Sequence, residues 1–523
     1  MLKRIITVTL AFCLMFALAF QPVGHAGYKF NPIPDYIGPP GTITIGDIPA
    51  HPDPEKPVIV FVQGLTNSSA AWYDGNDMYE RARLAGYETA FVELYDSAGT
   101  PKSYWDNGLL LADMLEDISA FFNGKKLAII GYSKGGVDAQ TALVHYGKHH
   151  LVSEVITIGS PHYGSELADL AYSSWTWWLA ALLGSRNEGT ESLQTGNMNY
   201  FRSITDNKPE VNQNKYYTIA GNHTGSIFSA TWWGGIMIPG ESDGVVSVVS
   251  AHLPYGHMLQ IGRWTHATVH LGANAYPVFH EHLSVSKPSF TSSDFSFVEK
   301  NREDAFELFV RGGEQSGMAE ETFYVENDVD TIVINWLSTE KHDTVELFSP
   351  EKNSRESIEV TAVEDTAFFN GAFHHQVEVK KPAVGEWKIR TYSQAETAYA
   401  FVVAFDSKLN SQLHLSEKKI NKNWQLTADV DRGQSTKNTA LDVAYQYQFT
   451  PADSTSGIHH SGKKEGVYRQ GRKEAAGNTV SLNAQEPGAY NLTIDIEGVT
   501  PAGEKFQRTI IKSSYIDEQG NIH

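Results

Sequence analysis

Two short stretches of the chain match G-x-S-x-G, the pattern that surrounds the nucleophilic serine of many hydrolases. One is GYSKG at 131–135, centred on Ser133, and the other is GESDG at 240–244, centred on Ser242. A serine hydroxyl is a weak nucleophile at neutral pH, so it needs a histidine to accept its proton and an acid to orient that histidine. The pattern by itself occurs often by chance, and the surrounding elements must decide between the two serines.

A nucleophilic serine of this kind lies on a sharp turn between a buried strand and a helix. The stretch KKLAIIGYSKGGVDAQTALVHY offers a strand at 127–130, glycines that permit a tight turn, and a helix from about 135 to 146. Around GESDG, Pro239 interrupts the approach, and the following VVSVVS favours a strand rather than a helix. We therefore predict Ser133 as the nucleophile, with a glycine turn that has no chemistry as the alternative.

The stretch GESDG can instead supply the acid. In an α/β hydrolase the chain order is serine, then aspartate or glutamate, then histidine. Asp243 follows the strand-like KYYTIAG and a loop, and it opens a turn before the β-prone VVSVVS. This position predicts Asp243 as the acid that orients the histidine. The alternative is an Asp-Gly turn with no further role.

Several histidines follow Asp243 and could complete the set: His252, His257, His266, His270, His280 and His282. His266 comes directly after the strand-like HMLQIGRW, and a histidine just past a strand end can reach the serine turn. His270 would lie one helical turn onward and is the second candidate. His280 and His282 fall on what is predicted as the last helix of this region. We predict the catalytic residues to be Ser133, Asp243 and His266.

The elements that must position these residues are those of an α/β domain at 27–287. Apolar runs such as PVIVFVQG, TAFVEL, LAIIGYS and VITIGSP alternate with amphipathic stretches at about 79–85, 109–122 and 135–146. Continuous β-branched runs are typical of buried parallel strands, and the alternation of strands with helices indicates a parallel sheet. An α/β domain with a mostly parallel sheet flanked by helices is expected.

From about Pro288 the pattern changes to strands that alternate apolar and polar residues between turn-formers. Examples are TIVINWL, HHQVEVKK and GEWKIRTY, followed after about Leu413 by WQLTADV, LDVAYQYQFT and GAYNLTIDIEGV. This pattern predicts two β-sandwich, Ig-like modules at 288–410 and 411–523. Two ideas for their role are open: attachment to a surface or insoluble polymer, and stabilisation or assistance with export. The sequence leaves the oligomeric state undecided.

The N-terminus predicts export. Residues 1–26 combine Lys3 and Arg4, an apolar run and small residues before Ala26, which is typical of a signal peptide cleaved near Ala26. The one cysteine, Cys13, lies inside this segment, so the mature chain would have no disulfide and no cysteine metal site. A formal charge of −20 makes nucleic acid an unfavourable partner. We expect a secreted protein.

Residues 57–285 resemble the secreted bacterial lipases and esterases of the α/β-hydrolase superfamily. The resemblance rests on VFVQGLTNSSAAW, GYSKGGVDA, IGSPHYGSELADL, and SDGVVSVVSAH followed by RWTHATVHLG, in that order. In that family the histidine follows the acid by a little over twenty residues, which favours His266 over His270. The resemblance does not extend to the β modules, which are not recognised.

The resemblance also implies an oxyanion hole and two departures. By the match, the donors would be the backbone N–H groups of Leu65 and Lys134. The family usually has His-Gly where this chain has Gln63-Gly64, and Met or Gln where it has Lys134. A cation beside the serine could favour acidic or polar acyl groups. Related lipases hold calcium through an aspartate at the position of Thr268, so no metal and no cofactor are expected here.

The segment LADLAYSSWTWWLAALLG at 167–184 is rich in tryptophan, with Trp175, Trp177 and Trp178. In lipases the segment after G-S-P-H-x-G often forms a mobile apolar lid, and such a patch would bind fat, membrane or polyester. A helix buried against the sheet is the equal alternative. His162, in SPHYG, is predicted at the mouth of the pocket, with a buried turn as the alternative.

These features predict a secreted hydrolase that cleaves carboxylic esters through an acyl-enzyme, acting on an ester or lipid at a lipid or polymer surface. Two alternatives remain open at this point. One is an extracellular polyester depolymerase, which would use the same catalytic residues and bind the solid polymer through its β modules. The other is a surface-binding protein with an inactive hydrolase domain.

Overall fold

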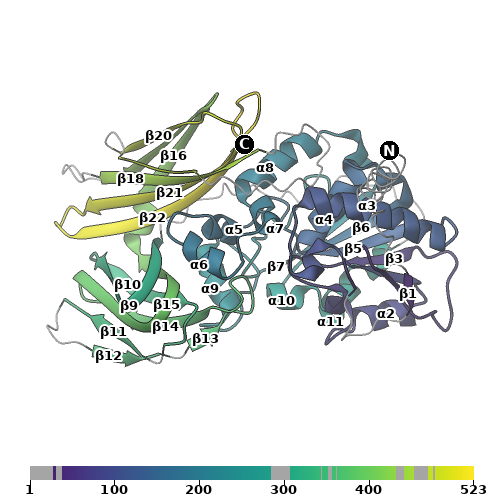
Figure 1. The fold of residues 1–523 in the computed structure, drawn as a ribbon, viewed down its shortest axis with the longest axis horizontal. Coiled ribbons are helices and arrows are strands. Elements are labelled where there is room, and N and C mark those ends of the chain that lie inside the picture. Colours follow the sequence, from purple (N-terminus) through teal and green to yellow (C-terminus); the bar gives the residue numbers. More distant parts are fainter. Residues whose placement is uncertain are drawn as a thin grey trace, which may run out of the picture.

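The structure is a computed structural model of the 523-residue chain. It describes residues 28–30, 38–283, 307–342, 344–350, 356–360, 362–431, 441–452, 469–474 and 478–523. The predicted signal peptide and the predicted boundary at 287–288 lie outside these residues. An α/β half and an all-β half lie side by side (Figure 1). Within the described ranges, no helix is long and apolar enough to cross a bilayer.

An eight-stranded sheet forms the centre of the α/β half, in the order β1-β2-β4-β3-β5-β6-β7-β8. Neighbouring strands are parallel except β2 and β4, so the predicted mostly parallel sheet is confirmed. The strands are β1 (Tyr28–Phe30), β2 (Ile43–Ile45), β3 (Val58–Val62), β4 (Thr89–Val92), β5 (Leu127–Tyr132), β6 (Val152–Ile158), β7 (Lys215–Gly221) and β8 (His257–Gly262).

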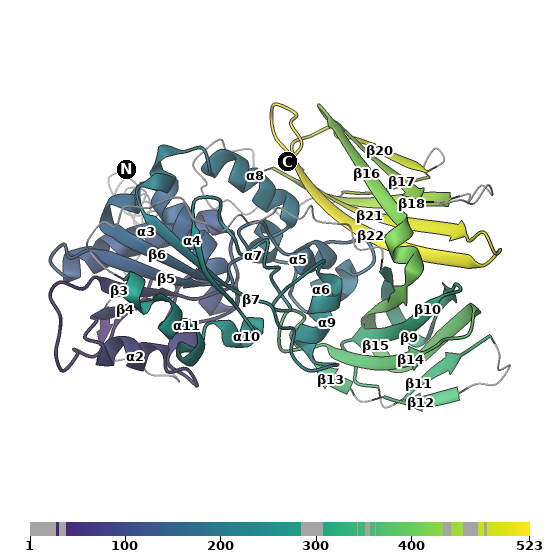
Figure 2. The same ribbon diagram turned by 180° about the vertical axis from the view of Figure 1, so that it is seen from behind.

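Helices follow the strands and cover both faces of this sheet (Figure 2). The α-helices are α2 (Met78–Leu84), α3 (Tyr104–Phe121), α4 (Lys134–Val144), α5 (Glu166–Ala171), α6 (Trp177–Leu182), α7 (Glu188–Ser192), α8 (Thr195–Thr205), α9 (Ala230–Met237), α10 (His266–Val269) and α11 (Gly272–Phe279). Short 3₁₀ turns lie between them: η1 (Ser69–Trp72), η2 (Tyr95–Ala98), η3 (Lys148–Leu151), η4 (Pro209–Asn212) and η5 (His280–His282).

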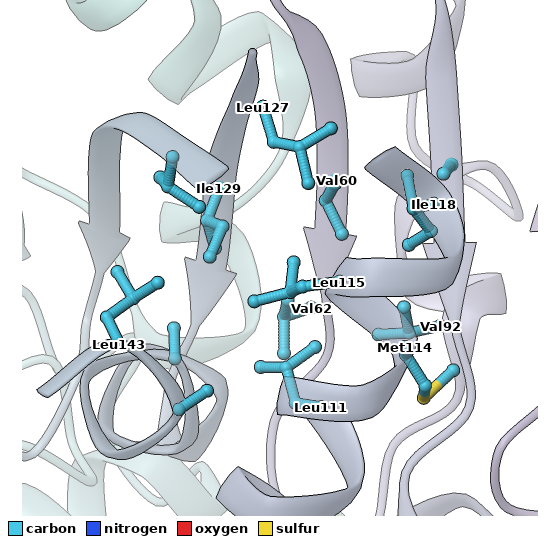
Figure 3. Close-up of a cluster of buried hydrophobic side chains, with 14 of the residues drawn as sticks. Val60, Val62, Val92, Leu111, Met114, Leu115, Ile118, Leu127, Ile129 and Leu143 are labelled. Atoms are coloured by element: carbon cyan, nitrogen blue, oxygen red, sulfur yellow. The ribbon is translucent and has the colours of Figure 1, made fainter. Parts of the chain in front are cut away.

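Both faces of the sheet are buried, which explains why its strands are apolar without alternation. Successive side chains of a strand point to opposite faces. Val60 and Val62 pack with α3 and α4 through Leu115 and Leu143 (Figure 3), whereas Phe61 packs on the other face with α2 and α11. Each fully buried side chain of this size contributes about 1.5–3 kcal/mol. The sheet is therefore a rigid frame for the loops at the carboxyl ends of its strands.

The first part of the β half is a single seven-stranded sheet in the order β12-β11-β15-β10-β14-β13, with β9 paired to β15. A register shift between Ser393 and Thr397 divides β15, so that its first part pairs with β11 and its second part with β10. The strands are β9 (Leu308–Val325), β10 (Val329–Ser338), β11 (Thr344–Phe348), β12 (Glu356–Glu359), β13 (Ala362–Glu364), β14 (Phe373–Lys380) and β15 (Gly385–Ser407).

The second part consists of two antiparallel sheets, β16-β17-β20 and β19-β18-β21-β22, which enclose one apolar core around Trp424, Tyr445 and Leu492. The turn η6 (Lys408–Gln412) connects it to β15, at the predicted join. Its strands are β16 (Leu413–Ile420), β17 (Asn423–Val430), β18 (Leu441–Pro451), β19 (Arg469–Glu474), β20 (Thr479–Asn483), β21 (Gly488–Val499) and β22 (Lys505–Ile516). Antiparallel sheets are confirmed for both modules, and the Ig-like assignment stays a prediction.

The two halves share an apolar core of their own. Leu167, Leu170 and Trp233 of the α/β half pack in one cluster with Leu337 and Val402 of the β half. Farther along the contact, Tyr200 of α8 stacks on Tyr515 of β22 at a ring-centroid distance of 4.2 Å. The β half therefore covers apolar side chains of α5, α6, α8 and α9 that would otherwise face solvent.

Candidate active site

Ser133 lies on the predicted turn between β5 and α4. Its backbone has φ 53° and ψ −130°, a conformation that a non-glycine residue adopts only under constraint. The flanking glycines make this turn possible, because a Cβ on Gly135 would lie 2.4 Å from the carbonyl oxygen of Gln63 and one on Gly136 would lie 2.2 Å from Ser160 Oγ. The backbone at Ser133 is therefore locally strained, and this conformation directs the side chain out of the turn.

His266 reaches Ser133 from the loop after β8, where it is the first residue of α10. Its Nε2 lies 3.1 Å from Ser133 Oγ, which is hydrogen-bond distance. The Tyr132 hydroxyl holds the backbone of His266 in place, because its Oη donates to the His266 carbonyl oxygen at 2.9 Å. Ser133 is 7 % exposed, so it is buried apart from a small part of its surface.

Asp243 lies on the other side of the imidazole and is 1 % exposed. Its Oδ2 accepts from His266 Nδ1 at 2.7 Å, while Oδ1 accepts from the backbone N–H groups of Val245 and Val246 at 3.0 and 2.8 Å. These contacts fix the carboxylate in one orientation. The strand expected for VVSVVS does not form, because this segment makes a series of turns that wrap around the carboxylate.

The structure thus brings Ser133, His266 and Asp243 into one hydrogen-bonded series, although they come from three separate loops. Ser242 takes no part, since its hydroxyl is 2 % exposed and accepts from the N–H of Gly244 at 3.4 Å within its own turn. His270 lies apart from Asp243, with its ring stacked on Tyr132 at a centroid distance of 4.0 Å. Burial lowers the pKa of His270 to about 4, so its ring is neutral at physiological pH.

His162 does not line the mouth of the site. It is fully buried, its ring Nε2 lies 3.1 Å from Thr157 Oγ1, and its backbone N–H donates to the carbonyl oxygen of Ser250. Burial holds its pKa well below the ordinary value. The prediction that His162 lies at the mouth of the pocket was therefore wrong. The alternative, a histidine in a buried turn, agrees with the structure.

The loop predicted to hold the first oxyanion donor lies directly against the serine. A Cβ on Gly64 would lie 2.8 Å from Ser133 Cβ, so only glycine permits this approach. The Gln63 side chain fixes the loop from behind. In the amide orientation that satisfies all of its partners, it donates to the Val92 carbonyl oxygen at 2.8 Å and accepts from Leu94 N at 2.9 Å and Ser97 Oγ at 2.8 Å. Leu65 follows on this anchored loop.

Lys134 also lies next to the serine, at the first position of α4, but its side chain points into the protein. The ammonium is 0 % exposed and forms ion pairs with Asp96 at 3.1 Å and Asp138 at 2.9 Å. The inference that it could select acidic acyl groups was wrong, because its charge is already neutralised inside the protein. Asp96 and Asp138 were missed from the sequence, although the i, i+4 spacing of Lys134 and Asp138 on a predicted helix was a usable signal.

The tryptophan-rich segment forms α5 and α6 and is held by the β half. Trp175 Nε1 donates to Asp495 Oδ2 at 3.3 Å, and the guanidinium of Arg311 lies 4.7 Å from the Trp175 ring centre. Trp177 and Trp178 open α6, where the Arg186 guanidinium lies 5.7 Å from the Trp177 ring centre. Leu179 and Ala180 of α6 are buried in the apolar cluster that includes Leu337 and Val402 of the β half, so this segment packs against the β half. The mobile lid stays a prediction.

The β half also contributes Phe368, in the turn between β13 and β14. It packs against the cluster of Ala168, Leu193 and Phe201, the cluster that Leu65 also contacts. No motif or spacing in the chain predicts that the β half approaches the loop beside the serine. Within the described residues, no three His, Cys, Asp or Glu side chains gather as a metal site.

Comparisons with known proteins agree with this architecture. The structure is similar to that of Bacillus licheniformis lipase BlEst2 in its propeptide form, with 36 % identity over 93 % of this chain and 99 % of that chain and a TM-score of 0.76. The mature form of the same lipase matches 47 % of this chain and 100 % of its own length at 47 % identity, with a TM-score of 0.45. No protein-family model and no curated protein sequence matches the chain.

Proposed function

The chain belongs to the bacterial lipases and esterases of the α/β-hydrolase fold and is a carboxylic-ester hydrolase, and we propose that Ser133, His266 and Asp243 carry out its reaction. The observation that carries this proposal is the position of the His266 ring between the other two side chains, 3.1 Å from Ser133 Oγ and 2.7 Å from Asp243 Oδ2. Both distances are within the reach needed for proton transfer.

In the first half of the reaction, His266 Nε2 takes the proton from Ser133 Oγ as the oxygen attacks the ester carbonyl. The carboxylate of Asp243 stabilises the imidazolium and holds Nδ1–H toward itself, so that Nε2 is free to accept. His266 then gives the proton to the departing alcohol, which leaves an acyl-enzyme. Water enters, passes a proton to Nε2, and releases the acid by the same steps in reverse order.

The negative oxygen of the tetrahedral intermediate would be stabilised by the backbone N–H groups of Leu65 and Lys134. Two features support this assignment. The loop carrying Leu65 approaches Ser133 closely at Gly64, and Lys134 is the first residue of α4, where a backbone N–H has no partner within the helix. The positive end of the helix dipole adds to the stabilisation.

The test is Ser133→Ala, with Ser242→Ala as the matched control from the second G-x-S-x-G stretch. Turnover of a p-nitrophenyl ester should fall by at least about a thousandfold in the first variant and stay within about threefold in the second. A fluorophosphonate probe should label the native chain and the control at one serine and fail to label Ser133→Ala. A loss under tenfold for Ser133→Ala contradicts the proposal.

The similar structures are lipases and esterases, so neither the polyester depolymerase nor the inactive surface protein is favoured. Export stays a proposal that rests on residues 1–26. N-terminal sequencing of protein from the culture medium tests it, and a start at Gly27 is expected. Protein retained in the cells with Met1 intact would contradict export.

We further propose that the chain is a precursor in which the β half closes the active site. The bacterial relative in its propeptide form spans the same two halves. In this chain, Asn491 of β21 donates to the carbonyl oxygen of Asp169 at 2.9 Å, and Thr493 Oγ1 accepts from the N–H of Ser174 at 2.9 Å. Both bonds hold the α5–α6 segment, whose counterpart in lipases opens to admit substrate.

This closure can be loosened without changing any residue of the reaction. In Asn491→Ala/Thr493→Val both bonds to the α5–α6 segment are lost, so the open state should gain population. We expect kcat/KM for a long-chain p-nitrophenyl ester to rise by about three- to tenfold, with a smaller rise for the acetate. Glu497→Ala, on the exposed end of the same strand, is the control and should change neither. An unchanged long-chain activity in the double variant would contradict closure by the β half.

A further inference from the structure

We propose that the side chain of Lys134, through its buried ion pairs, is a positioning residue that sets the distance between the two oxyanion donors. This inference rests on the proposed function, and it assigns a role to a charged cluster that the reaction itself does not use. The cluster lies directly behind the serine turn and joins elements that carry both donors.

The cluster has four members, all at most 1 % exposed: Lys134, Asp96, Asp138 and Asn107. Lys134 Nζ lies 3.1 Å from Asp96 Oδ2 and 2.9 and 3.2 Å from the two oxygens of Asp138. Asn107 Nδ2 donates to both carboxylates, at 2.5 Å to Asp96 and 3.3 Å to Asp138. A buried ammonium is tolerated only when it is paired and hydrogen-bonded, and here all of its partners are within the protein.

The members come from three different elements. Lys134 and Asp138 are one turn apart on α4, Asp96 lies on η2 after β4, and Asn107 lies on α3. Because α4 begins at Lys134, an ion pair from this residue to η2 fixes the start of the helix relative to β4. The backbone N–H of Lys134, the proposed second donor, is part of the segment so fixed.

The first donor is tied to the same place. The Gln63 amide, just before Gly64 and Leu65, bonds to Leu94 N and Ser97 Oγ, on either side of Asp96. The segment 94–97 therefore anchors the Leu65 loop through Gln63 and the start of α4 through Lys134. An oxyanion donor must lie within a few tenths of an ångström of its position to be effective. A shared anchor is a direct way to hold two donors to that tolerance.

The charge state of the cluster agrees with a structural rather than an acid–base role for the lysine. Although burial by itself lowers it, the carboxylates of Asp138 and Asp96 raise the pKa of Lys134, so the ammonium stays protonated. Burial raises the pKa of Asp138 to about 7 and also raises that of Asp96, against the opposing effect of Lys134. Neither carboxyl contacts Ser133 or His266, so the cluster can act only through the backbone that it fixes.

A second lysine–carboxylate pair, with a buried glutamate and a partly buried lysine, provides a control. Lys215 at the start of β7 lies 3.4 Å from Glu154 near the start of β6, and the glutamate side chain is 0 % exposed. This pair lies at the amino ends of the parallel strands, whereas Ser133 follows the carboxyl end of β5. Lys215→Met removes the same charge from the same domain without touching the oxyanion loop or the start of α4.

The experiment compares Lys134→Met with Lys215→Met on a p-nitrophenyl ester and on the corresponding thionoester, in which sulfur replaces the carbonyl oxygen. Sulfur accepts hydrogen bonds weakly, so the thionoester depends little on the oxyanion donors. Active sites are counted with a fluorophosphonate, and kcat is expressed per active site. Misplaced donors should lower ester turnover selectively, whereas general loss of structure lowers both reactions together.

For Lys134→Met we expect the ester kcat to fall by about 30- to 100-fold, the thionoester kcat by less than about fivefold, and KM to stay within about threefold for both. Lys215→Met should leave the ester-to-thionoester ratio at the native value. Equal losses on the two substrates, or an unchanged ester kcat, would overturn the inference.

Two further variants keep the test decisive. If Lys134→Met does not fold, Asp96→Asn replaces it, because this variant removes the ion pair to η2 while Lys134 keeps its pair with Asp138. Asp96→Asn should lower the ratio of ester kcat to thionoester kcat by about tenfold. An unchanged ratio overturns the inference. Ser133→Ala is measured in parallel. A chain that stays active in Ser133→Ala refutes the proposed function, whereas an inactive Ser133→Ala with an unchanged ratio in Lys134→Met refutes only the role of the lysine.

Discussion

His266 and Asp243 are joined twice: the backbone N–H of His266 donates to the Asp243 carbonyl oxygen at 2.8 Å, and their side chains meet at 2.7 Å. The backbone bond ties the loop after β7 to the loop after β8, so the side-chain bond is not left to two flexible loops. Gly221 permits this approach, because a Cβ there would lie 2.8 Å from Asp243 Cβ. The imidazole orientation is therefore set before substrate arrives.

Asp243→Asn should lower kcat by about a thousandfold to ten-thousandfold with little change in KM. Asparagine Oδ1 would keep the bonds from Val245 and Val246, and its Nδ2 would then face His266 Nδ1. The imidazole would be forced to carry its proton on Nε2, where it could no longer accept from Ser133. Steady-state kinetics on a p-nitrophenyl ester measure this, and a thermal melt within a few degrees of the native chain excludes misfolding. A loss under tenfold would remove Asp243 from the reaction.

The two histidines of the THATVH stretch should separate cleanly. His266→Ala removes the proposed general base and should lower kcat by at least about a thousandfold. His270→Phe keeps an aromatic ring on Tyr132 in place of an imidazole that burial already holds neutral, so kcat should stay within about threefold. The opposite result would assign the base to His270.

Asp138 should make stability depend on pH. Burial raises the pKa of Asp138 in the folded chain to about 7, above the ordinary value of an aspartate, so the folded state holds an extra proton between these two values. The associated stability is complete below about pH 4 and is lost as the pH rises to about 7. Asp138→Asn cannot ionise, so its free energy of unfolding should fall less than that of the native chain as the pH rises through this window. Urea unfolding at pH 5 and pH 8 checks the trend, and a parallel pH dependence in both proteins would contradict it.

Arg508 should be essential to the junction of the two β modules. Its guanidinium is 0 % exposed, pairs with Glu326 at 2.5 Å and lies 4.1 Å from the Phe405 ring centre. Arg508→Met leaves the Glu326 carboxylate buried without its partner, which should cost about 3–5 kcal/mol. Arg508→Met/Glu326→Leu should recover most of that loss, because no charge is left behind. Urea unfolding followed by tryptophan fluorescence measures both, and equal losses in the two variants would show that packing rather than charge holds the junction.

The sequence by itself predicted the α/β half and singled out the three residues that the structure brings together, Ser133, Asp243 and His266. Continuous β-branched runs specify strands buried on both faces, and a strand–glycine turn–helix pattern specifies where a serine can be strained. Both signals are local, because they depend on neighbours within about one element. The same locality explains why Asp243 and His266 could be predicted to lie together, since each follows a strand whose end lies at the same edge of the sheet.

Only the tertiary structure decided how the halves meet and where Lys134 points. A lysine next to a serine looks like a cation in the pocket until α3 and η2 are placed around it with Asn107 and Asp96. The segment 167–184 has the same apolar pattern whether it faces a lipid or a protein, because burial depends on which surface comes to cover it. That surface is formed by strands more than one hundred residues away in the sequence. Patterns within one element cannot predict a contact over that separation.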